Sequence, residues 1–238
     1  MPRWNNGWGV QILHEYRNRD ALLLKDRIEH NLDEQIHILH AQGVYTWTKA
    51  FRVTAKLPIV FGATREFPDD IQGDSGFGPL TLALPLKSYF NLDGRSGSFT
   101  LSPQLRVPTA SPDAFDVIIQ EWGNGLSVGY TTETYRYHFS LGASTWVYYG
   151  DKPSSVTLST DFGFNIQALG SSGHIKWMVA LLHETDDTYT LSGGPILYWR
   201  ISDLLHAQIL WRRDYYDRQG TLDHGNDNSF RYGFGVVY

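Results

Sequence analysis

The most restrictive feature of this chain is an alternation of apolar and polar residues, with a period of two, that runs from end to end. The C-terminal segment shows it most clearly, because one of its faces is entirely apolar or aromatic. That face carries Phe230, Tyr232, Phe234, Val236 and Tyr238. Successive side chains of a β-strand point to opposite faces of the sheet, so this period is typical of strands.

Equivalent segments occur along the rest of the chain and predict about twelve strands. The clearest ones are 51–61, 80–86, 99–107, 139–149, 156–166, 175–182, 191–201 and 205–211. Segments 8–16, 35–47 and 126–136 are strand-like with a less regular phase. The longest apolar run, 177–182, is much shorter than the roughly 20 residues of a membrane-spanning helix. The chain is therefore expected to be all-β, without a spanning helix.

The polar face of these strands decides between a soluble and a membrane fold. In a β-sandwich or a lipocalin-like barrel, the polar face meets water and is usually rich in Lys and Glu. Here charged residues make up only 19% of the chain and aromatic residues reach 14%, while Ser, Thr, Gly and Gln dominate the polar face. An apolar band outside, aromatic residues at strand ends and a polar lumen are typical of transmembrane barrels. We therefore predict a transmembrane, antiparallel, up-and-down β-barrel, with a soluble β-barrel or sandwich as the alternative.

Connection lengths test this prediction independently, because outer-membrane barrels have short turns on the periplasmic side and longer loops outside. With both termini periplasmic, the outer loops are expected at 17–34, 66–78, 109–125, 150–154, 184–188 and 217–228. The short turns are expected at 48–50, 91–97, 136–138, 168–173 and 202–203. No linker divides the chain, so residues 1–238 are predicted to form a single barrel domain. A faint helical period at 21–30 predicts one helical turn in the first loop, or a loop that folds back into the pore.

Composition excludes several functional classes. A net charge of -5, from 20 Lys and Arg against 25 Asp and Glu, argues against nucleic-acid binding, which needs clustered cations. The absence of cysteine excludes disulfides, cysteine-ligated metals and a cysteine nucleophile. Residues 1–7 lack the apolar core of a signal peptide, so either the chain is not exported or its signal has been removed.

The end of the chain and three internal motifs resemble known outer-membrane proteins. A terminal Tyr238 after Phe234 and Val236 is similar to the C-terminal signature that assembly machinery recognises in bacterial outer-membrane proteins. Residues 43–53 followed by Leu57-Pro58, residues 76–82 and residues 105–110 resemble the outer-membrane family named for the MetA pathway of phenol degradation. Pro79 stands where that family usually has Asp, and Ala110 where it has Gly. The resemblance covers about residues 35–238 and implies a barrel that passes small, often hydrophobic or aromatic, molecules, with no agreed catalytic residues.

Two motifs suggest catalysis, and each has a simpler explanation. Residues 73–76 spell the Gly-Asp-Ser-Gly of trypsin-like proteases, but the matching histidine segment and cysteines are missing, so we expect a glycine-rich loop. His138 and Ser140 have the spacing seen in outer-membrane phospholipase A. There the pair faces lipid, whereas the phase here directs it into the lumen. The sequence therefore predicts no catalytic residue, and a lipid hydrolase is the least favoured alternative.

Metal sites are not expected either. The nine histidines are scattered, and no spacing is typical of a metal site. The sequence Leu-His-Ala-Gln occurs at 39–42 and 205–208, which places His40 and His206 on the inward face. Residues 223–228 carry oxygen ligands suited to calcium, but a polar loop explains them equally. No cofactor is predicted.

The inward-facing charged and polar residues are the candidate site. The predicted lumen- and solute-lining residues are Arg52, Lys56, Lys87, Arg106, Glu133, Asp161, Lys176, Arg200, His206 and Arg212. They form either a network that neutralises buried charge or a constriction that filters solutes. The predicted function is a channel in the bacterial outer membrane for passive passage of small solutes, hydrophobic or aromatic ones among them. The expected partners are the lipid bilayer, lipopolysaccharide and the solutes. A structural barrel that docks an envelope protein is the alternative.

Overall fold

The structure of the chain is a computed structural model. It describes residues 6–19, 22–24, 27–29, 33–67, 70–92, 94–110, 120–168, 171–219, 222–223 and 228–238. Within these residues every regular element is a strand. No helix long and apolar enough to cross a membrane occurs in the described part of the chain.

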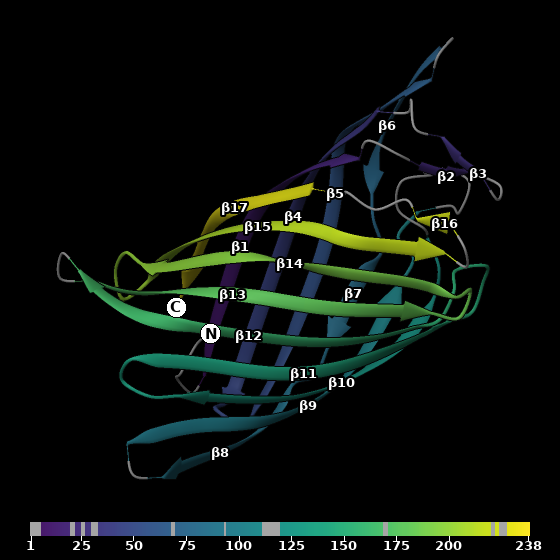
Figure 1. Cartoon of the computed structure of the whole chain (residues 1–238). Helices are drawn as coiled ribbons and strands as arrows, with labels where there is room; N and C mark the ends of the chain where they lie inside the picture. Colours follow the sequence, from purple (N-terminus) through teal and green to yellow (C-terminus); the bar gives the residue numbers. More distant parts are fainter. Residues whose placement is uncertain are drawn as a thin grey trace.

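The strands form one closed antiparallel barrel (Figure 1). The first strand, β1 (Gly7–Arg19), pairs on one side with β4 (Asp33–Thr48) and on the other with the last strand, β17 (Asn228–Val237), which closes the wall. Between them the wall contains β5 (Phe51–Phe67), β9 (Arg95–Val107), β10 (Gly123–Glu133), β11 (Tyr137–Tyr148), β12 (Ser155–Ala168), β13 (Ser171–Glu184), β14 (Thr188–Arg200) and β15 (Leu205–Gln219). One interrupted strand lies between β5 and β9. With it the wall has twelve strands, as the sequence predicted.

The interrupted strand consists of β6 (Asp70–Phe77), β7 (Leu80–Ala83) and β8 (Leu86–Leu92). The breaks fall at Pro79 and Pro85, and proline has no N–H to donate to the sheet. β7 pairs with both neighbours, β5 and β9, at three or more residues each. Strand β8 pairs along its length with β9 but meets β5 only at the pair Phe51 and Leu86. The wall is therefore thinnest in hydrogen bonds between β5 and β8.

The outer surface of the barrel is apolar. Outward-facing aromatic and aliphatic side chains from around the wall are exposed, and Phe99 (57%), Leu141 (54%) and Phe234 (59%) are more than half exposed. The fully buried side chains, by contrast, include Glu15, Glu34 and Arg52. A soluble barrel would bury its apolar face and expose its charges. The prediction of an inside-out barrel is confirmed, and the soluble alternative is wrong.

Both termini lie at the same end of the barrel (Figure 1). The backbones of Trp8 and Tyr238 exchange two hydrogen bonds, of 2.8 and 2.7 Å, and their rings stack 5.8 Å apart. Short connections join β4 to β5, β10 to β11 and β14 to β15 at this end, as predicted. We call it the terminal end, and the opposite end, which carries the longer connections, the loop end.

Three expected loops contain strands instead. In the predicted loop 217–228, β15 extends to Gln219 and pairs with β16 (Leu222–Asp223). The predicted loop 66–78 is largely replaced by β6, which pairs with the extension of β5 to Phe67. The helical turn expected at 21–30 is wrong, because β2 (Leu22–Leu24) and β3 (Arg27–Glu29) form a small two-stranded sheet.

Candidate functional site

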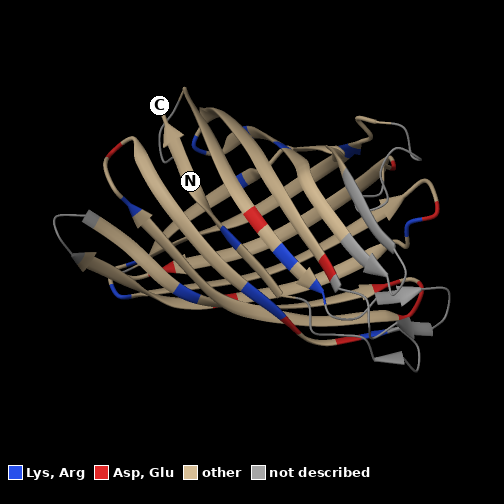
Figure 2. Ribbon diagram, turned by 90° about the horizontal axis from the view of Figure 1, so that it is seen from above, with Lys and Arg blue, Asp and Glu red and all other residues tan. Residues whose placement is uncertain are grey.

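Charged residues are interspersed along the barrel strands as well as at their ends (Figure 2). In a barrel of twelve strands the interior is wider than a simple packed core. Inward-facing charges therefore need partners from other strands, or water, to offset the cost of leaving bulk solvent. In the described residues these partners gather into separate clusters on different sides of the lumen, rather than into one ring.

The most buried cluster is centred on Glu15 of β1, whose side chain has no exposed surface. Its carboxylate accepts hydrogen bonds from Arg17 Nε at 2.8 Å and from Arg231 of β17, whose Nη2 lies 2.5 Å away. His40 of β4 contacts the same carboxylate through its Nε2. We call Glu15, Arg17, His40 and Arg231 the Glu15 cluster. It joins the three strands that meet at the closure of the barrel, and Lys56 of β5 lies within electrostatic range of it.

An apolar patch lies on the inner wall next to this cluster. It contains Ile36, Ile38, Val60 and Ala63 from β4 and β5, all at most 6% exposed. The β4–β5 register shifts between His37 and Ile38. A shift of one residue reverses which side chains point inward. The change of face falls on β5, where the buried positions move from Val60 to Ala63, while β4 keeps one phase with Ile36, Ile38 and His40 all buried. Part of the lumen is filled by aliphatic side chains.

A second polar cluster is centred on Asp161 of β12. Its carboxylate accepts a hydrogen bond of 2.5 Å from the Ser140 hydroxyl and lies 3.2 Å from Lys176 Nζ. His138 Nδ1 lies 3.0 Å from the other carboxylate oxygen. Ser140 and His138 therefore meet on Asp161 rather than on each other. This differs from a nucleophile held by its base and gives no support to a serine hydrolase.

The remaining predicted lining residues are spread over both ends of the lumen. At the terminal end, Arg52 is buried and donates from Nη2 to Lys49 O (2.9 Å) and Tyr89 Oη (3.2 Å). Arg200 pairs with Asp203 at the exposed rim of the same end. The other contacts are those of Glu133 with Asn165 (3.4 Å), Arg212 with Asp214 (3.5 Å) and Arg106 with the ring of Tyr148 (5.4 Å). Lys87 lies on the face of β8 opposite Leu86 and is half-buried.

A track of aromatic rings, which sequence reasoning missed, crosses the inner wall near the terminal end. Its ring pairs are His138–His174, His174–Tyr198 and Tyr198–His206, with centroids 5.7, 4.9 and 5.2 Å apart. Interplanar angles of 6°, 12° and 29° make these pairs stacked. The predicted residue His206 is thus part of a larger feature. The available signal was that all four residues occupy inward positions near the terminal turns.

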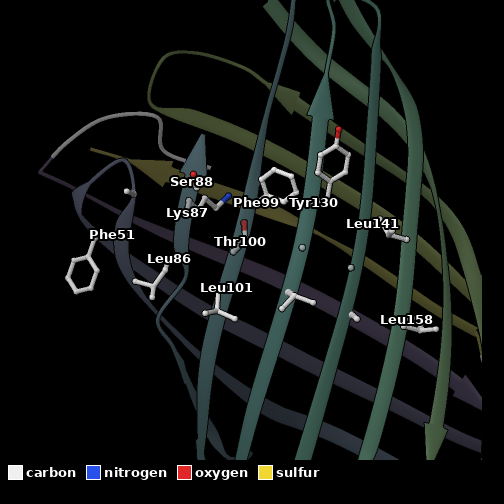
Figure 3. A pocket seen from close by; sticks show the side chains of 15 residues that line it. Phe51, Leu86, Lys87, Ser88, Phe99, Thr100, Leu101, Tyr130, Leu141 and Leu158 are labelled. Carbon is white, nitrogen blue, oxygen red and sulfur yellow. The ribbon is translucent and has the colours of Figure 1, made fainter. Parts of the chain in front are cut away.

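A groove of about 990 Å³ lies beside the thin seam of the wall (Figure 3). Its lining comes from β5 and from the successive strands β8 to β12. Most of its side chains are apolar and face outward, including Phe51, Leu86, Phe99, Leu101 and Leu141. The groove therefore belongs to the outer surface of the wall, distinct from the charged clusters of the lumen.

Neither a protein-family model nor a curated protein matches the sequence. Solved structures do match in fold. The COG4313 outer membrane channel from Pseudomonas putida F1 aligns over 100% of this chain and 97% of its own, with a TM-score of 0.69 and 17% identity. A KdgM porin in complex with disordered oligogalacturonate aligns over 97% of this chain and 99% of its own, with a TM-score of 0.57 and 8% identity. The NanC porin covers 95% and 98%, with a TM-score of 0.55 and 11% identity.

These likenesses show the fold over essentially the whole chain. The narrower resemblance to the phenol-degradation family stays a prediction. On the geometry and the comparisons together, this chain has the fold of the outer-membrane β-barrels.

Proposed function

We propose that the protein is a passive channel of the bacterial outer membrane for small solutes. The observation that carries this proposal is the inversion of polarity across the wall, with exposed aromatic and aliphatic side chains outside and charged clusters inside. Such a wall is stable in hydrocarbon because a closed barrel leaves no unpaired strand edge there. Similar folds in proteins named as outer membrane channels and porins support it.

The proposal orients the protein in the membrane. The terminal end, with its short turns, faces the periplasm, and the loop end faces outward. The whole chain acts as one barrel domain, with lipid and lipopolysaccharide around it. We assign the ten predicted lining residues to the lumen. We expect some of them to neutralise buried charge and others to filter solutes. The Glu15 and Asp161 clusters neutralise charge, and the cations near the ends influence which solutes enter.

The solute class follows from what lines the lumen. The track from His138 to His206 offers flat ring faces in the periplasmic half, and aromatic rings stack favourably with other flat apolar groups. These features support small solutes that are partly hydrophobic or aromatic.

Conductance in planar bilayers tests the channel directly. We expect the purified protein to conduct ions, and Lys176→Gln to shift the ion preference toward cations by about twofold, because the carboxylate of Asp161 loses a cationic partner in the lumen. The measurement is the reversal potential in a salt gradient. Arg136→Gln, which removes an equal charge from an exposed turn, is the control and is expected to leave the preference unchanged.

A folded barrel that never conducts would contradict the proposal and favour the alternative of a docking barrel. In that case a stoichiometric envelope protein should be purified together with it. Hydrolysis of phospholipid that is lost in Ser140→Ala would instead support an enzyme.

A further inference from the structure

Two aromatic side chains form a flat shelf on the inner wall at the loop end. Trp146 and Tyr148 of β11 are stacked in nearly the same orientation, with an interplanar angle of 7° and centroids 5.9 Å apart. Residues two apart on a strand share a face, so the two rings lie side by side along β11. We call this pair the Trp146–Tyr148 shelf.

Glycines of the neighbouring strand allow the shelf to lie flat. In β10, Gly125 pairs with Trp146 and Gly123 with Tyr148. A Cβ atom at either glycine would lie only 2.8 Å from the indole of Trp146 or 2.7 Å from the ring of Tyr148. The rings therefore rest against bare backbone. Such cover also protects the glycines and stabilises the strand pair, so the flat rings alone do not indicate a ligand.

Two cations at one end of the shelf are not explained by covering glycine. Arg106 Cζ lies 5.4 Å from the centroid of Tyr148, and Lys152 Nζ lies 5.1 Å from it. Arg106 comes from β9, where it pairs with Gly123. Lys152 comes from the turn after β11. Cations above an aromatic face are attracted to it, but two like charges on one ring also repel each other.

The position of Lys152 is held by a carboxylate. Glu121 accepts the backbone N–H of Asp151 at 2.8 Å and that of Lys152 at 3.1 Å. Burial lowers the pKa of the Lys152 ammonium below its ordinary value, and the nearby Glu184 opposes this shift. An anion bound beside Lys152 would also oppose it. The turn is thus fixed in a conformation that keeps a partly buried ammonium next to Tyr148.

We propose that the Trp146–Tyr148 shelf binds a solute made of a six-membered ring with an apolar face and a carboxylate, with the ring on Trp146 and the carboxylate between Arg106 and Lys152. This inference rests on the proposed channel function, since it places a solute site at the outer mouth of the lumen. Stacking accounts for the ring, and charge-assisted hydrogen bonds account for the carboxylate. Aromatic acids and sugar acids share this chemistry.

The test is titration calorimetry on the full chain in detergent, with benzoate and galacturonate as the two acidic probes. Benzyl alcohol and galactose are their uncharged counterparts. We expect at least one acid to bind about tenfold more tightly than its uncharged counterpart, because the uncharged ring lacks the contacts with Arg106 and Lys152. The tighter acid identifies the source of the ring. Calorimetry needs no ion current, so a failure of the channel proposal and a failure of this site give different results.

Variants locate the site. Arg106→Gln and Lys152→Gln are each expected to weaken binding of the acid about tenfold without weakening binding of the uncharged ring, and Trp146→Leu to weaken both. Lys152 lies in a turn outside the strands, so its substitution tests the site even if Trp146→Leu does not fold. Arg136→Gln, at the opposite end, is the matched control and is expected to bind like the wild type. If neither acid binds more tightly than its uncharged counterpart, or if both cation variants bind like the wild type, the inference is overturned.

Discussion

Replacing Glu15 with Gln is expected to lower the free energy of unfolding by about 3 kcal/mol, the cost typical of breaking a buried ion pair from one side. Glu15 is the only carboxylate that the contacts described for Arg17, His40 and Arg231 have in common. A glutamine keeps the size of the side chain and part of its hydrogen bonding, but not its charge. The two guanidinium groups would then repel each other next to Lys56.

The same substitution is expected to change permeation. Loss of the central anion leaves a cationic surface on one side of the lumen. The reversal potential in a salt gradient should therefore show a stronger preference for anions. Urea unfolding in detergent measures the stability change. Asp203→Asn is the matched control, because its carboxylate is 89% exposed and pairs only at the rim, where such pairs contribute little. Equal stability of the Glu15 and Asp203 variants would show that the Glu15 cluster does not hold the closure together.

Gly233→Ala is expected to disrupt the closure of the wall strongly. Gly233 of β17 pairs with Leu13 of β1, where the first and last strands close the barrel. A Cβ atom there would lie 2.0 Å from Ile12 O and 2.8 Å from Leu13 Cα. These are backbone atoms, which cannot rotate away as a side chain could. We expect a loss of about 3 kcal/mol, at the upper end for overpacking, and a lower yield of closed barrels.

Gly43→Ala provides the control for this prediction. Gly43 lies within β4, and a Cβ atom there would meet no atom within 4 Å. Its substitution is expected to change stability by less than about 0.5 kcal/mol. The measurements are urea unfolding and the shift in electrophoretic mobility that distinguishes a folded barrel from an unfolded chain. If both alanine variants fold equally well, β1 and β17 can move apart to accept the methyl group, and the prediction is wrong.

The number and direction of the strands could be predicted from the sequence, because strand periodicity is a local property. Segments such as 156–166 and 205–211 have one apolar and one polar face, and each became part of a single wall strand. The segment 80–86 has the same period but spans two strands, since Pro85 interrupts it. The alternation records which way a side chain would point, but not whether the backbone there can donate a hydrogen bond.

The candidate site could be predicted only as a set of inward residues. Arg52, Asp161 and Lys176 are predicted on the inward face, yet the sequence did not indicate that Lys176 pairs with Asp161 while Arg52 donates hydrogen bonds to Lys49 and Tyr89. The Glu15 cluster was missed for a similar reason. Glu15 and Arg231 are 216 positions apart, and they meet only because β17 pairs with β1. The Trp146–Tyr148 shelf likewise depends on the glycines of β10, which pair with it only in the folded barrel.

The sequence by itself determined that this chain is a twelve-stranded barrel with an apolar exterior, because apolar and polar residues alternate within each strand. Only the tertiary structure decided which inward residues meet. Closure of the sheet sets the register between strands that are distant in the chain, and register determines the distance between any two charges or rings. The ion pairs, the ring track and the shelf are therefore properties of the closed barrel and not of any single segment.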